Sequence, residues 1–511
     1  MLSKTVIYIG VVLILAVLSL AVLANSMTKP AKRVGHDEQM YCTAGVLLAQ
    51  GKMIYRDFSY VAQMPYHPLL YAALFKALNT SYYLLTGRIV SVVCDILVVV
   101  CIVGIYRLIF KPFVVTGLLL GLGASVLWIF NPLVDYANGF AWNHDVVILC
   151  VTLSLWLLLS TDLRLKSRYW KVALIGVLLT LASCMRITTV IVQLVFVVFL
   201  LGVWSKSLKE KIGTALPFLV SSAIVLIWPI WLIASAPRAF FLNVFWIPVL
   251  NGKWLHEIGM AYNKVGLTFG SLTTVGYLAI IATGIYLCVV LVLCRHKLKG
   301  VNTGKALVVF LVAVAMFGIA YIPLTMWRQY LAMPVSFLVL GFAYPLMWLR
   351  KFSYIKYFKI GLIIFIVGIV MTVTSHTIVL RRIPRLFSFE NWVPVKVHRI
   401  SEDIAAKIKE PKLILTLAPL YAIEGGSDIY TEFSAGPFVY RVADYISSWN
   451  LDITHTTGPR TLKKLVEKSP PSAVILGVEP EFLEAALFKA AVEADWERRT
   501  YDNGVTVYFR P

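Results

Sequence analysis

Apolar stretches long enough to cross a membrane follow one another through most of the chain. A helix needs about 20 apolar residues to span a bilayer core, and eleven stretches meet or approach that length, two of them short. They lie at about 5–24, 83–106, 112–131, 144–160, 171–184, 188–204, 214–235, 271–294, 306–323, 330–349 and 359–380. The pattern predicts a polytopic α-helical membrane protein with about eleven transmembrane helices within residues 1–380.

Two long inserts interrupt this pattern. The first, residues 25–82, contains GHDEQMYCTAGVLLAQGK (35–52) and YRDFSYVAQMPYHPLLYAALFKAL (55–78). Both have helical apolar spacing but are too short or too polar to span, so they predict interfacial helices lying on the outer leaflet. The second insert, about 236–270, is rich in aromatic residues, as membrane-interface segments are.

The pattern changes at residue 381. Short β-branched or apolar runs, KLILTLA (412–418) and SAVILGV (472–478), are typical of strands, and PEFLEAALFKAAVEA (480–494) has helical periodicity. ERRTYDNGVTVYFR (497–510) predicts a hairpin that turns around residues 502–504. Residues 381–511 therefore form a predicted small soluble α/β domain.

Composition and charge fix the orientation. The 511 residues are 59% hydrophobic and only 14% charged, with a mean hydropathy of +0.80, which excludes a disordered chain and a soluble nucleic-acid binder. Residues 1–380 carry 30 Lys and Arg against 9 Asp and Glu, whereas residues 381–511 carry 17 of each. With the N-terminus inside, the basic loops at 107–111, 164–171, 206–211, 295–305 and 350–359 all lie inside, opposed only by Asp162 and Glu210. An odd number of spans then places residues 381–511 on the outer face.

Several other classes of feature are missing from the sequence. The first apolar run is long for the core of a signal peptide and suits an uncleaved helix. The seven cysteines lie in or near apolar stretches without a CxxC pair, so neither a disulfide framework nor a zinc site is predicted. The glycines after 412–418 do not match a nucleotide-binding fingerprint. We therefore expect no metal and no cofactor.

Few carboxylates lie on the outer side of the membrane part. They are Asp37, Glu38, Asp57, Asp135, Asp145 and Glu257. Asp37 and Glu38 are adjacent and open the first predicted interfacial helix. They have two interpretations: Asp37 caps the helix with Glu38 in its first turn, or the pair carries chemistry, because ionisable groups at membrane depth are costly unless they are used or paired.

The context favours chemistry. A first span, an Asp-Glu that opens an outer helix, a Gly-Lys that ends it, and then YRDFSYVAQMPYHPLLYAALF together resemble the first loop of the GT-C superfamily of lipid-phosphosugar glycosyltransferases. The likeness is to the branch of the dolichyl-phosphate-mannose protein mannosyltransferases and the lipid A aminoarabinose transferases. It covers the topology of about residues 1–380, with a signature of about 45 residues. The resemblance implies that Asp37 is catalytic, with Glu38 as the second letter of the motif.

Sugar transfer from a polyprenyl phosphate needs a carboxylate to accept the acceptor's proton and cations to hold the departing phosphate. The related aminoarabinose transferases have Lys-Pro-Pro in the first loop, whereas this chain has Gln63, Met64 and Pro65, which leaves Arg56 or His67 as substitutes. The residues predicted to bind substrate are Arg56, Asp57, His67, Arg88, His144, Asp145, Arg186 and Arg328.

Purely structural roles also remain open for several of these residues. The arginines can snorkel to lipid headgroups, and Asp145 can belong to a helix capped by Asn143. Asp95 is predicted to pair with Arg88 or to make a polar helix contact. The loop within 415–441 either recognises a sugar-like acceptor or packs as a lid on the membrane part.

The sequence thus predicts an inner-membrane glycosyltransferase that moves a monosaccharide, with inversion, from a polyprenyl-phosphate donor to a hydroxyl of a glycolipid, polysaccharide or protein. Its active site and C-terminal domain would face outward, and no nucleic acid is an expected partner. A secondary transporter is one alternative, although no repeat of two halves is visible. A polymer ligase that uses a lipid-pyrophosphate donor is the other.

Overall fold

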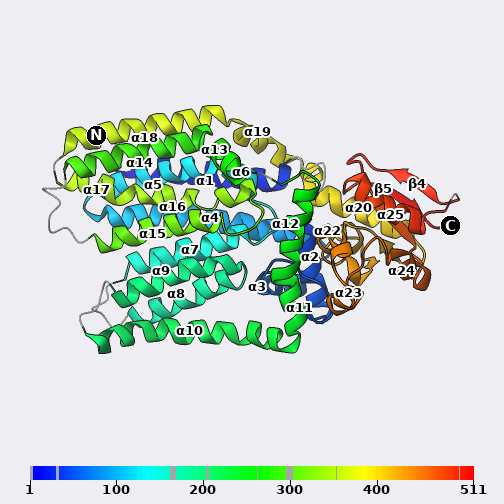
Figure 1. Cartoon of the computed structure of the whole chain (residues 1–511). Coiled ribbons are helices and arrows are strands. Elements are labelled where there is room, and N and C mark those ends of the chain that lie inside the picture. The colour runs from blue at the N-terminus through cyan, green and yellow to red at the C-terminus, as the bar shows by residue number, and fades with distance from the viewer. Residues whose placement is uncertain are drawn as a thin grey trace.

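The computed structural model describes residues 4–29, 34–161, 168–202, 207–261, 263–294, 303–352, 354–493 and 495–511. A bundle of long helices forms one end of the molecule, and a mixed part with a small sheet forms the other (Figure 1). The chain starts at the far end of the bundle and finishes in the mixed part.

An apolar helix occupies each of the eleven predicted stretches. These helices are α1 (Lys4–Thr28), α4 (Tyr83–Ile109), α5 (Val114–Ile129), α7 (His144–Leu159), α8 (Arg168–Ser183), α9 (Val190–Gly202), α10 (Leu208–Ser235), α14 (Val275–Leu293), α15 (Gly304–Ile319), α16 with α17 (Val335–Gly341 and Ala343–Lys351) and α18 (Ile355–Ser375). Within the described residues, seven helical segments are long and apolar enough to cross a membrane, and four apolar helices are shorter. The membrane-protein fold is confirmed, whereas eleven crossings stay a prediction.

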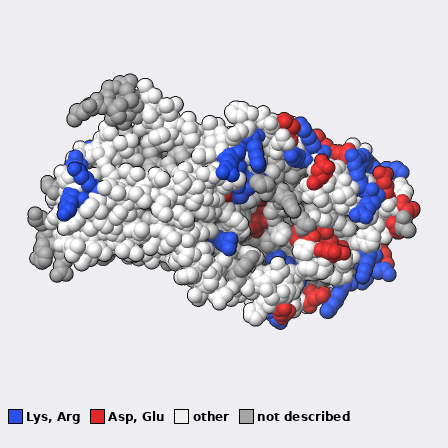
Figure 2. Space-filling view, turned by 90° about the horizontal axis from the view of Figure 1, so that it is seen from above, with Lys and Arg blue, Asp and Glu red and all other residues white. Residues whose placement is uncertain are grey.

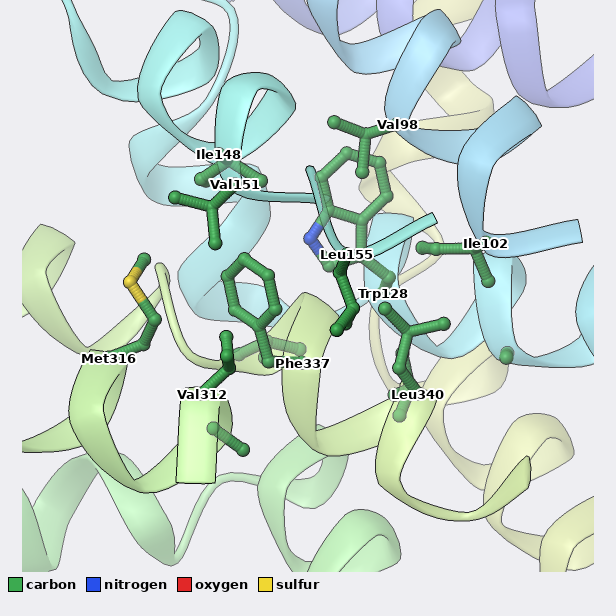
Figure 3. Packing of buried hydrophobic residues seen from close by; sticks show 14 of the residues in the cluster. Val98, Ile102, Trp128, Ile148, Val151, Leu155, Val312, Met316, Phe337 and Leu340 are labelled. Atoms are coloured by element: carbon green, nitrogen blue, oxygen red, sulfur yellow. The ribbon is translucent and has the colours of Figure 1, made fainter. Parts of the chain in front are cut away.

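The bundle is apolar both inside and outside. In its centre, Val98 of α4, Trp128 of α5, Leu155 of α7 and Phe337 of α16 pack together and are almost fully buried (Figure 3). The outer helices also expose large apolar side chains, among them Ile227 of α10, at 65%. A helix that is apolar on all sides is stable only where lipid replaces water.

The predicted inner connections meet at one end of the bundle. Lys305 donates to the carbonyl of Leu159 at 2.6 Å, Lys171 donates to Ser160, and the Arg350 guanidinium lies 4.8 Å from the centre of the Phe113 ring. Six basic residues predicted for this side and the acidic Asp162 lie outside the described residues; the six are Arg164, Lys166, Lys206, Arg295, Lys297 and Lys299.

The first outer insert forms α2 (His36–Ala49) and α3 (Tyr66–Leu78). The second predicted helix therefore begins eleven residues later than expected, because Tyr55 and Ala62 take positive φ angles and Pro65 precedes the helix. Residues 38–47 of α2 are all buried, so α2 does not lie open on a leaflet. It packs against α21 (Leu420–Ile423), and the Gln39 side chain accepts a hydrogen bond from the Leu420 amide.

The second insert forms α11 (Pro237–Phe241), η3 (Leu242–Trp246), α12 (Ile247–Glu257) and α13 (Lys264–Leu272). Helix α12 runs between the bundle and the C-terminal part (Figure 1). There Asn251 donates to the carbonyl of Phe438 at 2.9 Å. This insert therefore attaches the C-terminal part to the membrane part.

The C-terminal part follows α19 (Ile378–Arg382), η6 (Ile383–Phe387), η7 (Phe389–Asn391) and α20 (Val393–Lys407). Its five-stranded sheet has the order β2-β1-β3-β5-β4, with β1 parallel to β2 and β3, and with β5 antiparallel to β3 and β4. The strands are β1 (Leu413–Leu415), β2 (Asp428–Ile429), β3 (Ala473–Leu476), β4 (Glu497–Thr500) and β5 (Thr506–Phe509). The accompanying helices are α22 (Pro437–Tyr440), α23 (Ser448–Thr454), α24 (Leu462–Lys468) and α25 (Glu481–Ala491). The two predicted strands, the helix after the second and the final hairpin are confirmed.

Candidate functional site

Helix α2 presents Asp37 and Glu38 in its first turn. The helix starts at His36, and its N-cap is Gly35 in an extended conformation, without a side-chain capping bond. Asp37 is therefore not the N-cap, and the capping interpretation of this residue is wrong. The two carboxylates also differ in exposure, because Glu38 is 1% exposed and Asp37 only partly buried.

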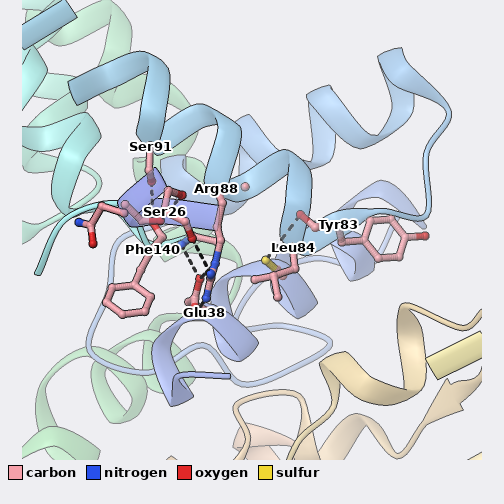
Figure 4. A network of polar contacts seen from close by, with 12 residues as sticks. Ser26, Glu38, Tyr83, Leu84, Arg88, Ser91 and Phe140 are labelled. Atoms are coloured by element: carbon pink, nitrogen blue, oxygen red, sulfur yellow. Dashed lines mark hydrogen bonds and ion pairs between the residues drawn. The ribbon is translucent and has the colours of Figure 1, made fainter. Parts of the chain in front are cut away.

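Glu38 belongs to a buried ion pair. Its two oxygens accept hydrogen bonds from Nε and Nη2 of Arg88 in α4, both at 2.9 Å, and one oxygen also accepts from the Ala141 amide at 2.8 Å (Figure 4). Arg88, which is 0% exposed, donates a third bond to the Ser26 carbonyl of α1 at 2.7 Å. We call this set the Glu38–Arg88 cluster; it ties α1, α2, α4 and the loop before α7 together.

Asp37 faces a different environment. Among the described residues no group donates a hydrogen bond to its carboxylate, while the cations of Arg186 and Arg441 act on it electrostatically. Burial raises the pKa of Asp37 above its ordinary value, and the neighbouring His36, Arg441 and Arg186 oppose that rise. A carboxylate with a raised pKa and no internal partner is a better proton acceptor than an ordinary aspartate.

Arg186 lies in the break between α8 and η2 (Ile187–Thr189). Its guanidinium sits 4.6 Å from the centre of the Tyr330 ring and donates to the sulfur of Met333 at 3.1 Å. Arg186 lies close enough to Asp37 to act on its carboxylate electrostatically. Its role in substrate binding stays a prediction.

Gln63 lies where the sequence resemblance leads us to expect a lysine, and its side chain is linked through Asn143 to the segment that contains Arg186. Asn143 donates from one amide nitrogen to the Gln63 side chain at 2.8 Å and to the Met185 carbonyl at 2.9 Å. Asn143 occupies the N-cap position of α7, but its side chain makes no capping bond. It instead links Gln63 to Met185, the residue that precedes Arg186.

Arg441 enters the site from the C-terminal part, directly after α22. Its guanidinium donates to the Asn251 side chain of α12 and lies 5.1 Å from the ring centres of both Trp254 and Phe438. Burial lowers the pKa of Arg441 to about 10, which still leaves it charged at neutral pH. The sequence gives no local signal for this residue, because only the tertiary fold brings its charge near Asp37.

His144 and Asp145 are buried at the start of α7. Asp145 accepts a hydrogen bond from the Gly139 amide at 2.9 Å, and its second oxygen has no partner among the described residues. Asp95 accepts from Asn138 at 2.8 Å. Of the two possibilities for Asp95, the structure therefore has the polar contact and not the pair with Arg88, whose carboxylate partner is Glu38.

The cations predicted for the first loop lie elsewhere. Arg56 forms an exposed pair with Asp57 at 2.7 Å, and Asp57 also accepts from the Met53 amide. His67 is fully buried between Tyr41 and Tyr71, and burial lowers its pKa to about 3. His67 is consequently neutral at physiological pH and brings no positive charge to a phosphate.

Arg328 is the first residue of η5 (Arg328–Leu331), a short helix that also contains Tyr330. Tyr330 of η5 covers Arg186, whereas Arg328 lines an open cleft with Lys29 and Arg382. The structure therefore brings together Asp37 and Arg186, adds Arg441, and leaves Arg328 outside this group. In the described part of the chain no cluster of His, Cys, Asp and Glu is suited to a metal ion.

The fold has solved counterparts, although neither a protein-family model nor a curated protein matches the sequence. ArnT from Cupriavidus metallidurans, in a crystal structure with bound undecaprenyl phosphate, superposes with a TM-score of 0.60 at 13% identity, over 99% of this chain and 98% of that chain. The oligosaccharyltransferase AglB from Archaeoglobus fulgidus, in complex with an inhibitory peptide and a dolichol-phosphate, gives 0.51 at 12%, over 97% of this chain and 74% of that chain. The chain therefore shares the fold of these two solved proteins, and the predicted fold class is confirmed.

Proposed function

We propose that this protein is a membrane glycosyltransferase that moves a monosaccharide from a polyprenyl-phosphate donor to a hydroxyl of an extracytoplasmic acceptor. The observation that carries the proposal is the Asp37 carboxylate, which lacks a hydrogen-bond donor among the described residues and faces Arg186 and Arg441 at the outer end of the bundle. The lipid phosphates bound to the two solved proteins of the same fold support the class of donor.

The residues suit one in-line displacement. The acceptor oxygen forms a bond to the anomeric carbon while the bond from that carbon to the donor phosphate oxygen breaks, which inverts the configuration. Asp37 takes the acceptor's proton. The polyprenyl phosphate departs with growing negative charge, which Arg186 and Arg441 stabilise by charge-assisted hydrogen bonds.

The test uses the purified full chain in detergent with polyprenyl-monophosphate and polyprenyl-diphosphate donors that carry the same radiolabelled sugar. Transfer of label from the monophosphate, abolished in Asp37→Asn, is the expected result. Transfer from the diphosphate alone would favour the polymer ligase. Uptake of free sugar into sealed proteoliposomes, without any new glycosidic bond, would favour the transporter.

The orientation is part of the same proposal. The basic loops meet at the end of the bundle opposite α2, as the positive-inside rule requires of an inner face. Asp502 is exposed in the turn between β4 and β5. Asp502→Cys should react with a membrane-impermeant maleimide in intact cells or spheroplasts. The parent protein should not, because six of its seven cysteines are buried and the exposed Cys288 lies within the candidate span of α14. Labelling only after lysis would overturn the outward placement of residues 381–511.

A further inference from the structure

A second group of cations, which includes Arg328 of η5, lines an open cleft of about 390 Å³. Its polar lining comprises Lys29, Asp135, Ser271, Thr274, Arg328 and Arg382. In the space-filling view, Lys and Arg gather where the uncharged membrane part meets the mixed-charge C-terminal part (Figure 2). Its volume falls within the usual range of ligand sites, about 300–1,000 Å³.

The cleft carries excess positive charge with free donors. Arg382 is 7% exposed and donates to Asn25 at 2.6 Å and to Asp135 at 2.5 Å, yet its Nε has no partner among the described residues. The second oxygen of Asp135 pairs with His376 at 2.9 Å. Arg328 is exposed, and its side chain has no partner in the described part of the chain. Asp135 therefore compensates Arg382, and Lys29 donates to the carbonyls of Asp135 and Tyr136. Arg328 and the Nε of Arg382 keep donors without a partner among the described residues.

Four candidate spans end at this cleft. One span ends at Thr28, next to Lys29; another starts at Val275, next to Thr274; a third starts at Arg328; and the fourth ends at Ser375, shortly before Arg382. The cleft therefore lies at the level where spans meet water. Beside it, α13 exposes Val265 at 75% and Phe269 at 70%, which is an apolar surface suited to acyl chains.

We infer that this cleft binds the phosphate of a membrane lipid headgroup, at a site distinct from the donor phosphate at Asp37. Arg328 and the free Nε of Arg382 hold the phosphate oxygens, with Lys29 beside them. The hydroxyls of Ser271 and Thr274 line the same wall. The apolar face of α13 accompanies the lipid tail. The inference concerns binding alone and does not depend on the proposed transfer reaction.

The experiment measures lipid binding to the purified full chain by native mass spectrometry. Arg186→Gln serves as the parent protein, because it disables the competing phosphate site at Asp37. The probe is dioctanoyl phosphatidic acid, compared with dioctanoyl phosphatidylcholine and inorganic phosphate. Arg328→Gln is added to this parent, with Lys253→Gln as the matched control, because Lys253 is another exposed cation of the outer part that does not line the cleft.

Arg328→Gln should weaken binding of phosphatidic acid at least about tenfold, the scale of one lost charged hydrogen bond. Lys253→Gln should leave it unchanged, and Arg328→Lys should retain most of it. Equal affinity in the parent and in Arg328→Gln would overturn the site. Inorganic phosphate binding as tightly as phosphatidic acid would overturn the lipid assignment, and so would phosphatidylcholine binding as tightly.

Discussion

Two neighbouring residues of α2 lie in opposite surroundings. Glu38 is buried, and the guanidinium of Arg88 and a backbone amide saturate its oxygens. Asp37, one residue earlier, is partly exposed and lacks a hydrogen-bond donor among the described residues, although two arginines lie nearby. A bidentate pair holds helices in place, whereas a carboxylate with free oxygens is available to an incoming hydroxyl. The adjacent pair thus divides into one carboxylate held in an ion pair and one that we propose takes part in the chemistry.

The largest expected effect comes from the Glu38–Arg88 cluster. Glu38→Gln leaves the Arg88 cation buried without its counter-charge, which should cost about 3–5 kcal/mol of unfolding free energy. Thermal unfolding of the purified variant checks this. The control is Asp57→Asn, which breaks the exposed pair with Arg56 and should leave the melting temperature nearly unchanged. If Glu38→Gln were stable but inactive, Glu38 would take part in the chemistry, and the distinction between Glu38 and Asp37 would be wrong.

Asp37→Asn should lower the transfer rate about 10²-fold or more, the scale of a lost general base and about 2.7 kcal/mol in barrier. Its stability should not fall, because no cap or hydrogen bond is lost. Because the pKa of Asp37 is raised in the folded state, stability is lost as the pH rises from the ordinary pKa to the raised one. A neutral asparagine avoids that loss and should hold or raise the melting temperature at neutral pH. Normal turnover of this variant would exclude Asp37 from the mechanism.

Arg186→Ala should weaken donor binding by about 1.5–3 kcal/mol, the range for a hydrogen bond to a charged group. Lys253→Ala serves as its matched control, because Lys253 is an exposed cation of the outer part that lines neither site. Titration with a non-transferable polyprenyl phosphate measures both variants. An equal loss in the two variants would show a general effect of lost charge, and unchanged binding in Arg186→Ala would favour headgroup snorkelling by Arg186.

The smallest expected effect concerns Arg441. This cation lowers the pKa of Asp37 against the effect of burial, so Arg441→Gln should raise that pKa further. The ionised carboxylate is the active form, so the acidic limb of the rate profile should move to higher pH, while the Arg441→Lys limb should stay close to the wild type. An unmoved limb in Arg441→Gln would remove Arg441 from the surroundings of Asp37.

The sequence predicted features set by local pattern. Apolar runs located the helices, and alternation with a turn located the hairpin of β4 and β5. The first-loop motif pointed to Asp37. The motif could not show which of Asp37 and Glu38 is engaged in an ion pair, because the partner of Glu38 is Arg88, about 50 residues later in the sequence. It missed Arg441, because only folding brings that residue to α2. The sequence analysis grouped Arg328 with Arg186, because no pattern shows that Arg328 lines a different cleft.

The Glu38–Arg88 cluster and the group of Asp37, Arg186 and Arg441 are completed by residues far apart in the sequence. This separation sets the order in which the two groups can form. Glu38 and Arg88 both belong to the first 90 residues, so their pair can close soon after α4 inserts into the membrane. Arg441 leaves the ribosome roughly 20 to 70 seconds later at ordinary elongation rates. A nascent chain can therefore form the Glu38–Arg88 cluster long before its proposed transfer site is complete. A chain released before residue 441 lacks one of the two cations at that site.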